Sequence, residues 1–127
     1  LCEIGAHAEG SGVDCNLEMH GDFYRWEYTL RAVELADNDR IGIVYNCDPR
    51  ESQWGTISTF LDPVARYLRH VHLHDIESPK YPYQNLFRIL RNMGYDGYLS
   101  LEASPSSDPE RVLAIYARLF DCMVELA

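Results

Sequence analysis

The sequence lacks the features that would place it in a membrane or on nucleic acid. No apolar run approaches the roughly 20 residues of a membrane span, and no basic segment precedes an apolar one at the start. Its 20 acidic residues outnumber its 11 basic ones, which gives a net charge of -9. No basic cluster with interleaved aromatics offsets this charge, so we expect neither a membrane nor a nucleic-acid partner.

Cysteines are also few and widely spaced. The four of them contain no C-x-x-C pair and are spread over the whole chain: Cys2, Cys15, Cys47 and Cys122. This pattern is typical of reduced thiols in a cytosolic protein rather than of a disulfide scaffold. We therefore expect a cytoplasmic protein whose cysteines are buried structural residues.

The length is small for the architecture that the rest of the sequence indicates. With 127 residues, 46% hydrophobic and 24% charged, the chain can form one core. A complete α/β barrel needs about 250 residues. Because the chain also begins at Leu1 rather than Met, we expect residues 1–127 to be a single partial domain, a fragment of a longer protein.

Hydrophobic periodicity predicts alternating helices and strands. Strands are expected at 13–18, 41–46, 70–74 and 97–102, and helices at 1–9, 26–36, 56–69, from 81 and from 109, with loops at 20–23 and 47–55. Pro63 must break the third helix or start a new turn with Asp62 as its cap. The fourth helix opens with Pro82 in its first turn and ends at Gly94, where a left-handed C-cap belongs.

The last helix has the clearest signals. Asp108 is an N-cap, and Pro109 stands at the first helical position. Its expected apolar face consists of Val112, Ile115, Tyr116, Leu119 and Met123. Strict alternation of strands and helices with short connections predicts parallel strands joined by right-handed crossovers.

The predicted strands have one polar and one apolar face, because alternate side chains of a strand share a face. The polar face carries Asn16, Glu18, Asn46, His70, His72, Ser100 and Glu102, and the apolar face carries Leu17, Ile43, Tyr45, Val71, Leu73, Leu99 and Leu101. An open parallel sheet would be covered by helices on both faces. A barrel interior explains the polar face, so we predict an α/β fold of about four βα units, half of a (β/α)8 TIM barrel.

Four residues at or near strand ends form the candidate metal site: Glu18, Asn46, His72 and Glu102. Two carboxylates, an imidazole and an amide oxygen suit one divalent ion of the Mn, Mg, Co or Zn kind. Such an ion polarises a carbonyl, while Glu18 and Glu102 on either side of a substrate move a proton at the neighbouring carbon. This chemistry is aldose–ketose isomerisation or epimerisation.

The remaining polar residues near the strand ends receive supporting roles. We expect His70 to be hydrogen-bonded deeper in the barrel and His74 to lie at the mouth, where it could touch substrate. Asp75 is expected to orient a neighbouring loop or a ligand histidine. His20 and Arg50 are candidates for contacts to the hydroxyls or the phosphate of a substrate.

Three segments carry a family resemblance that covers nearly the whole chain. They are Leu17–His20 (L-E-x-H), Val71–Asp75 (V-H-x-x-D), and Gly94–Glu102, which is followed by the helix at Asp108-Pro109. Together they resemble the second, C-terminal half of the xylose isomerase-like TIM barrels, the sugar phosphate isomerase/epimerase superfamily, which also includes endonuclease IV-type enzymes.

The resemblance implies roles for individual residues. Glu18, His72 and Glu102 match positions that bind one divalent metal, with the two glutamates flanking the substrate for proton transfer through an enediolate. Many members have an aspartate at the end of the sixth strand and a histidine three residues later, where this sequence has Asn46 and Pro49. The fourth ligand is therefore either the amide oxygen of Asn46 or the carboxylate of Asp48.

Three functions follow from these observations. The first is a metal-dependent isomerase or epimerase of a small sugar or sugar phosphate. The second is an endonuclease IV-type metal nuclease, which the charge of -9 disfavours. The third is a non-enzymatic, carbohydrate-binding barrel homologue, which Asn46 and Pro49 favour. A half-barrel also exposes two edge strands, so we expect it to need a missing N-terminal half-barrel or to self-associate.

Overall fold

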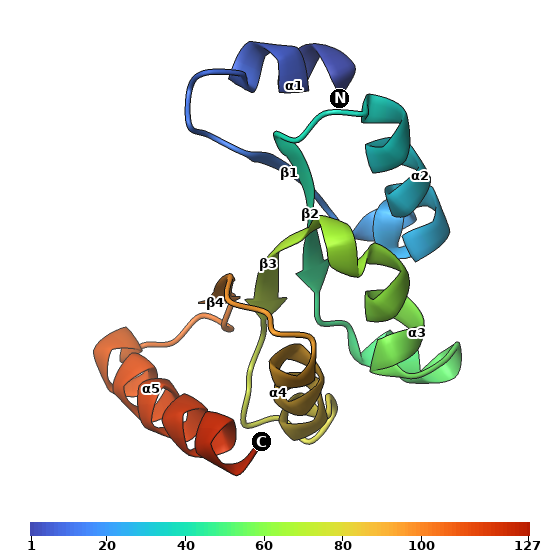
Figure 1. Ribbon diagram of the computed structural model, residues 1–127. Helices are drawn as coiled ribbons and strands as arrows, with labels where there is room; N and C mark the ends of the chain where they lie inside the picture. Colours follow the sequence, from blue (N-terminus) through green and yellow to red (C-terminus); the bar gives the residue numbers. More distant parts are fainter.

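The computed structural model describes residues 1–127 and shows alternating helices and strands (Figure 1). The elements are α1 (Cys2–Ala8), β1 (Cys15–Glu18), α2 (Trp26–Ala36), β2 (Ile41–Asn46), α3 (Ile57–Leu61), β3 (Leu68–Leu73), α4 (Tyr83–Asn92), β4 (Tyr98–Leu101) and α5 (Pro109–Leu126), with 3-10 helices η1 (Gly21–Tyr24), η2 (Pro49–Gln53) and η3 (Asp62–Tyr67). The predicted order, one helix followed by four βα units, is confirmed. None of the helices combines the length and hydrophobicity that crossing a bilayer requires.

The four strands form one parallel sheet in the order β1-β2-β3-β4. This is the α/β architecture of a partial TIM barrel, with β1 and β4 at the two edges. The register shifts once, between Ile43 and Val44 of β2, so that Arg69 of β3 has no partner residue there. Figure 1 shows α2 and α3 together on one side of β2, which leaves the other side to the barrel interior.

The predicted apolar face of the sheet is the core. Ile43, Tyr45, Val71 and Leu73 are at most 2% exposed, and Leu17, Leu99 and Leu101 pack against them partly buried. Burying one such aliphatic side chain contributes roughly 1.5–3 kcal/mol. On the opposite face, the Nε2 of His70 lies 2.7 Å from the Oγ of Ser100, the hydrogen bond expected of a histidine inside the barrel.

The predicted helix at 56–69 is wrong in its second half. α3 ends at Leu61, and the chain continues as η3 before β3 begins at Leu68. Pro63 lacks the N–H that an α-helix would need, so the chain tightens into a 3-10 helix there. The predicted break at Pro63 is confirmed, whereas the alternative of an Asp62 cap is wrong, because the N-cap is Leu61 and has no side-chain hydrogen bond.

Other boundaries differ by one or two residues. β1 begins at Cys15 rather than at 13, and β3 ends at Leu73 rather than at 74. Pro82 is the residue before α4 rather than part of its first turn. Gly94 has a φ of 68°, as a left-handed helix end requires.

The predicted apolar face of α5 is confirmed at every residue except Ile115. Tyr116 is buried, and Val112, Leu119 and Met123 pack partly buried against the core, whereas Ile115 is 51% exposed. Phe120 and Val124 also pack against the core, because α5 lies mainly against α4, next to the free edge at β4. The predicted cap is confirmed, because Asp108 Oδ1 accepts a hydrogen bond from the N–H of Arg111 at 3.2 Å.

All four cysteines are free thiols, but they are not all buried. Only Cys47, directly after β2, is fully enclosed, and burial raises the pKa of its thiol. Cys2 and Cys122 are exposed on helices, so the expectation of buried cysteines is wrong for these two.

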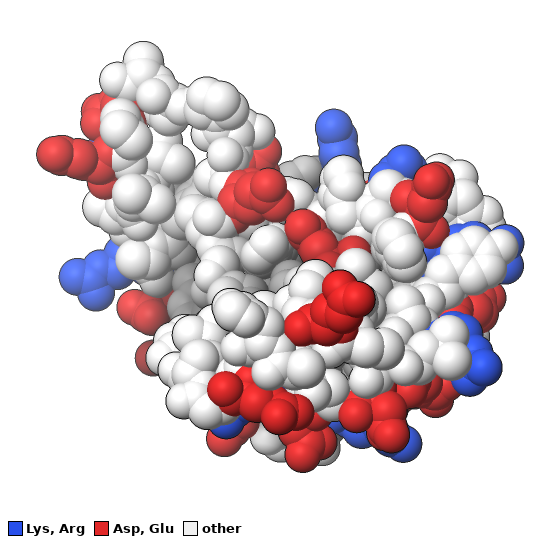
Figure 2. All heavy atoms as spheres, turned by 90° about the horizontal axis from the view of Figure 1, so that it is seen from above, with Lys and Arg blue, Asp and Glu red and all other residues white.

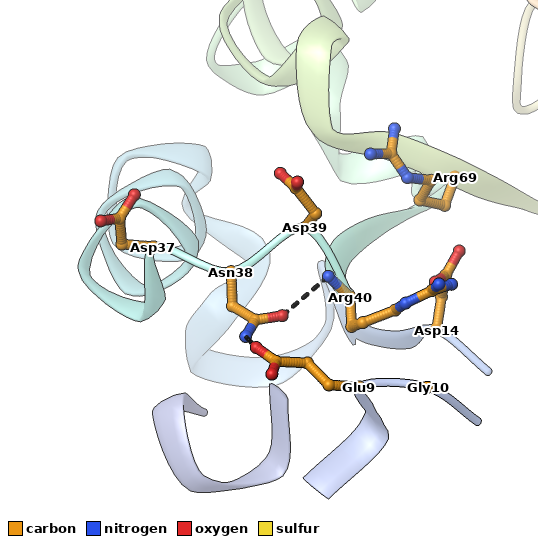
Figure 3. A pocket seen from close by; sticks show the side chains of 8 residues that line it. All are labelled: Glu9, Gly10, Asp14, Asp37, Asn38, Asp39, Arg40 and Arg69. Atoms are coloured by element: carbon orange, nitrogen blue, oxygen red, sulfur yellow. Dashed lines mark hydrogen bonds and ion pairs between the residues drawn. The ribbon is translucent and has the colours of Figure 1, made fainter. Parts of the chain in front are cut away.

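The end of the sheet at which the strands begin is polar and structural. A hollow there is lined by Glu9, Gly10, Asp14, Asp37, Asn38, Asp39, Arg40 and Arg69 (Figure 3). Asn38 donates to Glu9 at 3.0 Å, and Arg40 pairs with Asp14 at 3.1 Å, so the turn before β2 is held against α1 and β1. In barrels this end serves stability, whereas chemistry occurs at the other end. Seen from above, acidic side chains are scattered over the surface and outnumber the basic ones (Figure 2).

One carboxylate lies inside the core. Glu51 of η2 is 3% exposed, and its Oε2 accepts hydrogen bonds from the hydroxyls of Tyr45 at 2.6 Å and Tyr81 at 3.1 Å. Burial raises the pKa of Glu51 to about 7, although the two tyrosine hydrogen bonds act in the opposite direction. Folding thus makes this carboxyl harder to ionise than it is in the unfolded chain.

This pKa predicts a pH dependence of stability. Because the folded pKa lies above the unfolded value of 4.5, the native state binds the proton more tightly, and the free energy of unfolding falls as pH rises from about 4.5 to about 7. The shift corresponds to about 3 kcal/mol. In Glu51→Gln this part of the pH dependence disappears, as urea unfolding from pH 4.5 to 8 will show. If the free energy of unfolding changes with pH in the same way in the parent and the variant, the raised pKa of Glu51 is refuted.

The exposed edges of the sheet predict self-association. Neither β1 nor β4 has a partner on its outer edge, and Tyr98 of β4 is 79% exposed. Unpaired strand edges are templates for pairing with other strands. We expect residues 1–127 alone to sediment as dimers or larger species. A monodisperse, cooperatively unfolding monomer in ultracentrifugation and calorimetry would contradict this.

Candidate functional site

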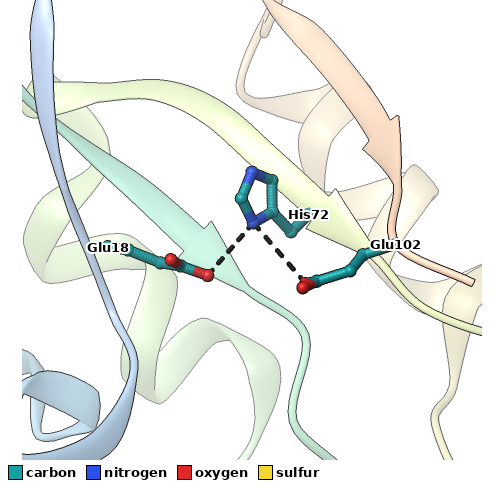
Figure 4. A group of neighbouring side chains, drawn as sticks. All are labelled: Glu18, His72 and Glu102. Carbon is teal, nitrogen blue, oxygen red and sulfur yellow. Dashed lines mark hydrogen bonds and ion pairs between the residues drawn. The ribbon is translucent and has the colours of Figure 1, made fainter.

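Three ligand-type side chains from three strands meet at the carboxyl end of the sheet (Figure 4). His72 Nδ1 lies 3.1 Å from Glu18 Oε1 and 3.8 Å from Glu102 Oε2. One ligand atom from each of the three residues lies within 4.8 Å of the others. The convergence predicted from the strand ends also included Asn46, which lines the same hollow as Glu102.

The sheet itself positions these side chains. Glu18 is the last residue of β1, and His72 is the penultimate residue of β3 and pairs with Asn46 of β2. Glu102 follows β4 directly, and its N–H donates to the Leu73 carbonyl at 2.6 Å, which extends the ladder by one residue. The backbone therefore fixes all three positions before any ligand binds.

A hollow of about 430 Å³ opens beside this cluster, at the side of Glu102. It is lined by His20, Asn46, Cys47, Asp48, Pro49, His74, Asp75, Ser78, Lys80, Tyr81, Tyr83 and Glu102. These residues come from the segments that follow β1, β2, β3 and β4. The hollow lies at the carboxyl end of the parallel sheet, which is the end at which barrels bind their ligands.

His74 connects two of the strand ends. Its Nε2 lies 2.6 Å from Asn46 Oδ1, and its Nδ1 lies 3.2 Å from the carbonyl oxygen of Glu102. A neutral imidazole donates through one nitrogen only, so the two contacts together require either an imidazolium or an Asn46 amide that presents its NH₂ to His74. In the first state the Asn46 oxygen is taken up by His74, and in the second it is free for another ligand.

Asp48 and Arg50 form a close ion pair. Arg50 Nε donates to both carboxylate oxygens of Asp48, at 2.8 and 2.9 Å. Burial raises the pKa of Asp48, but the hydrogen bonds and charge of Arg50 outweigh it, so that this pKa lies below its ordinary value. Asp48 lines the hollow, whereas Arg50 points towards Asp48 and lies 5.5 Å from the ring of Tyr24. His20 lines the hollow and is exposed.

Asp75 holds a loop, as expected. Its carboxylate accepts hydrogen bonds from the N–H and the Oγ of Ser104, at 3.0 and 2.7 Å, and from the hydroxyl of Tyr116 at 3.3 Å. The two hydrogen bonds from Ser104 lower the pKa of Asp75. Because Ser104 stands two residues after Glu102, this contact also restrains the loop that carries Glu102.

The three clustered side chains fit a divalent metal by their chemistry. Two carboxylates and one imidazole are the ligands that Mn²⁺, Co²⁺ and Zn²⁺ accept, and carboxylates alone suit Mg²⁺. The structure gives two further oxygen donors at the end of the neighbouring strand, in Asn46 and Asp48. Asp48 does not belong to the cluster of three, and the Asn46 amide contacts His74.

Several residues at this end of the barrel were missed by the sequence reasoning. Ser78 and Lys80 line the hollow, and the hydroxyl of Tyr83 accepts a hydrogen bond from the N–H of His74 at 2.9 Å. The buried contact between Glu51 and Tyr45 was also missed. One signal was present: a tyrosine on the apolar face of a buried strand needs a partner for its hydroxyl.

The fold is similar to that of several solved sugar epimerases. They include D-psicose 3-epimerase from Clostridium cellulolyticum H10, solved with D-tagatose (19% identity, TM-score 0.67, 79% of this chain and 38% of that chain), and D-allulose 3-epimerase from Methylomonas sp. (12%, 0.72, 91% and 45%). A third is 3-keto-D-glucoside 4-epimerase from E. coli (20%, 0.74, 91% and 50%). At these identities the likeness shows the fold, and this chain spans half or less of each of these proteins.

The sequence places the fold in a family. No curated protein matches this chain. Residues 1–121 match the family described as xylose isomerase-like TIM barrel. The match covers the four strands and most of α5, including every residue of the strand-end cluster. The chain therefore belongs to the xylose isomerase-like TIM barrel family.

Proposed function

We propose that this chain supplies the metal-binding half of a divalent-metal-dependent sugar isomerase or epimerase. The observation that carries the proposal is the convergence of Glu18, His72 and Glu102, from three separate strands, at the end of the sheet where barrels perform chemistry. Because side chains alternate along each strand, the fold itself places these three side chains on the inner face of the sheet.

The proposed reaction moves a proton at the carbon next to a carbonyl. Glu18, His72 and Glu102 would hold the ion, which when bound polarises the carbonyl and an adjacent hydroxyl. Glu18 and Glu102 reach the cluster from β1 and β4, on opposite sides of His72. One carboxylate would remove the proton and the other would return one from the opposite face of an enediolate.

A fourth ligand would come from the end of β2. Asn46 is 5% exposed and contacts His74, whereas Asp48 lies further along in the lining of the hollow. Asp48 carries a full negative charge but is paired with Arg50. We propose that Asn46 or Asp48 completes the ligand set, the first with less charge than the second.

The proposed substrate is a small sugar or sugar phosphate. The neighbours in structure are named for D-psicose, D-allulose and a 3-keto-D-glucoside, all of which are carbohydrates. His20 and His74 line the hollow and can hydrogen-bond to hydroxyl groups. Arg50 is engaged by Asp48 and would have to turn to reach a phosphate.

The first prediction concerns the metal. In the native protein that contains this chain, His72→Ala removes one of three clustered ligands, so divalent-ion affinity should fall by more than the roughly 10–100-fold that loss of a supporting partner costs. Titration calorimetry with Mn²⁺ and elemental analysis measure this loss. The exposed His7, replaced by alanine, is the matched control and should leave affinity unchanged. Equal affinity in His72→Ala and the parent would exclude this site.

The second prediction concerns proton transfer. Glu102→Gln keeps the size of the side chain but removes a proton-accepting group, so kcat for epimerisation should fall by roughly 10²–10⁴-fold. Exchange of solvent deuterium into a ketose, followed by NMR, reports the step directly. The metal content is measured in the same samples, and Glu110→Gln on exposed α5 serves as control.

The outcomes of this second test separate the alternatives. Turnover that survives Glu102→Gln unchanged would refute the proposed role of Glu102. A parent protein that binds metal and sugar without any exchange would instead be a carbohydrate-binding barrel.

A further inference from the structure

We infer that Glu51 is a positioning residue that ties together the segments around the sugar-binding hollow. It does so through the hydroxyl groups of Tyr45 and Tyr81, beside which the hydroxyl of Tyr24 is also buried, and we name these four residues the tyrosine–carboxylate hub. The inference concerns how the proposed substrate is held, and in that respect it rests on the proposed function. Its structural part does not depend on any activity.

The hub joins segments that follow three consecutive strands. Tyr24 ends η1, which follows β1, and Glu51 lies in η2, which follows β2. Tyr81 stands in the connection between β3 and α4, and Tyr45 lies within β2 itself. A single carboxylate thus lies at the meeting point of three segments that are up to 57 residues apart in sequence.

The contacts within the hub form a closed set. Glu51 Oε2 lies 2.6 Å from the hydroxyl of Tyr45 and 3.1 Å from that of Tyr81, and the two hydroxyls lie 2.8 Å apart. All three side chains are at most 5% exposed. Hydrogen bonds to a charged or buried acceptor are stronger than those at a surface. Because the two hydroxyl groups are buried, water cannot replace Glu51 as their acceptor.

Two polar atoms of the hub remain without partners. They are Glu51 Oε1 and the hydroxyl of Tyr24, both fully buried. Tyr24 packs against the segment that carries Glu51, because its ring centroid lies 5.8 Å from that of Trp54 and 5.5 Å from the guanidinium carbon of Arg50. A side chain with an N–H or O–H at the place of Oε1 could donate to Tyr24, which a carboxylate cannot do.

Each segment carries lining residues of the hollow close to its hub residue. His20 lies four residues before Tyr24, Asp48 three residues before Glu51, and Lys80 directly before Tyr81. The link continues inward, since the ring of Tyr81 lies 4.8 Å from that of Tyr83, whose hydroxyl accepts from the N–H of His74. The hub is therefore the packed support beneath the wall of the hollow.

The metal-ligand cluster stands apart from the hub. Glu18, His72 and Glu102 are held by strand pairing on the inner face of the sheet, whereas Tyr45 points to the outer face. Loss of the hub should therefore loosen the loops and weaken sugar binding while leaving the metal cluster in place. A general loss of stability would affect both alike.

The test compares Glu51→Leu with Glu51→Gln in the native protein that contains this chain. Leucine fills a similar space but offers no acceptor, and glutamine offers an oxygen to Tyr45 and Tyr81 and an N–H to Tyr24. Hydrogen exchange by mass spectrometry follows segments 20–25, 47–55 and 75–82. Mn²⁺ affinity and the KM for a ketose are measured on the same samples, with Glu34→Gln on the exposed face of α2 as control.

We expect faster exchange in all three segments of Glu51→Leu, by roughly tenfold or more, because buried hydroxyl groups lose their acceptor, and the parent pattern in Glu51→Gln. Mn²⁺ affinity should fall far less than in His72→Ala, because Glu18, His72 and Glu102 are held by the sheet, and KM should rise with kcat less affected. If Glu51→Leu does not fold, Tyr81→Phe removes one hydroxyl and should release 75–82, with Tyr28→Phe, an exposed tyrosine, as its control.

Unchanged exchange in the leucine variant, or an effect confined to 47–55, would overturn the inference. Failure of glutamine to restore the parent pattern would overturn it as well. If the parent protein has no epimerase activity, the exchange measurements still decide the role of the hub, and the proposed function fails by itself.

Discussion

The site depends on the pairing register of one parallel sheet. Because side chains alternate along a strand, a register that buries Tyr45, Val71 and Leu73 outside the barrel also places Glu18, His72 and Glu102 inside it. A slip of one residue would exchange the two sets and would cost several buried apolar side chains at once. The hydrophobic core and the candidate metal site are thus two results of the same constraint, and neither can change register without the other.

Much of this could be predicted from the sequence because it depends on local periodicity. The bounds of α2 and β2 follow from clear 3.6-residue and buried-strand patterns, and the ligand cluster follows from strand ends. The division of 56–69 into α3, η3 and the start of β3 was harder, since apolar residues fit either structure and only Pro63 marked a change. The exposure of Ile115 and the inward position of Phe120 depend on how α5 packs against α4, which no local pattern encodes.

The tyrosine–carboxylate hub could not be predicted for a related reason. It pairs an outward tyrosine of β2 with a carboxylate of η2 and a hydroxyl from beyond β3, and only tertiary structure brings these together. The same holds for the contact between His74 and Asn46. Burial opposes the ionisation of Glu51, so the free energy of unfolding is lower at neutral pH than at acidic pH. This cost arises at the residue that supports the wall of the hollow. Such a conflict between stability and arrangement is typical of functional regions.

We propose that the strand-end cluster binds one divalent ion. The most direct test is a crystal structure of the native protein, grown with Mn²⁺ and recorded at a wavelength where manganese scatters anomalously. We expect one anomalous peak at about 2.0–2.2 Å from ligand atoms of Glu18, His72 and Glu102, with a fourth contact at Asn46 or Asp48. A protein that crystallises with no peak there, or with its only manganese at the polar hollow beside Asp14 and Asp39, would contradict it.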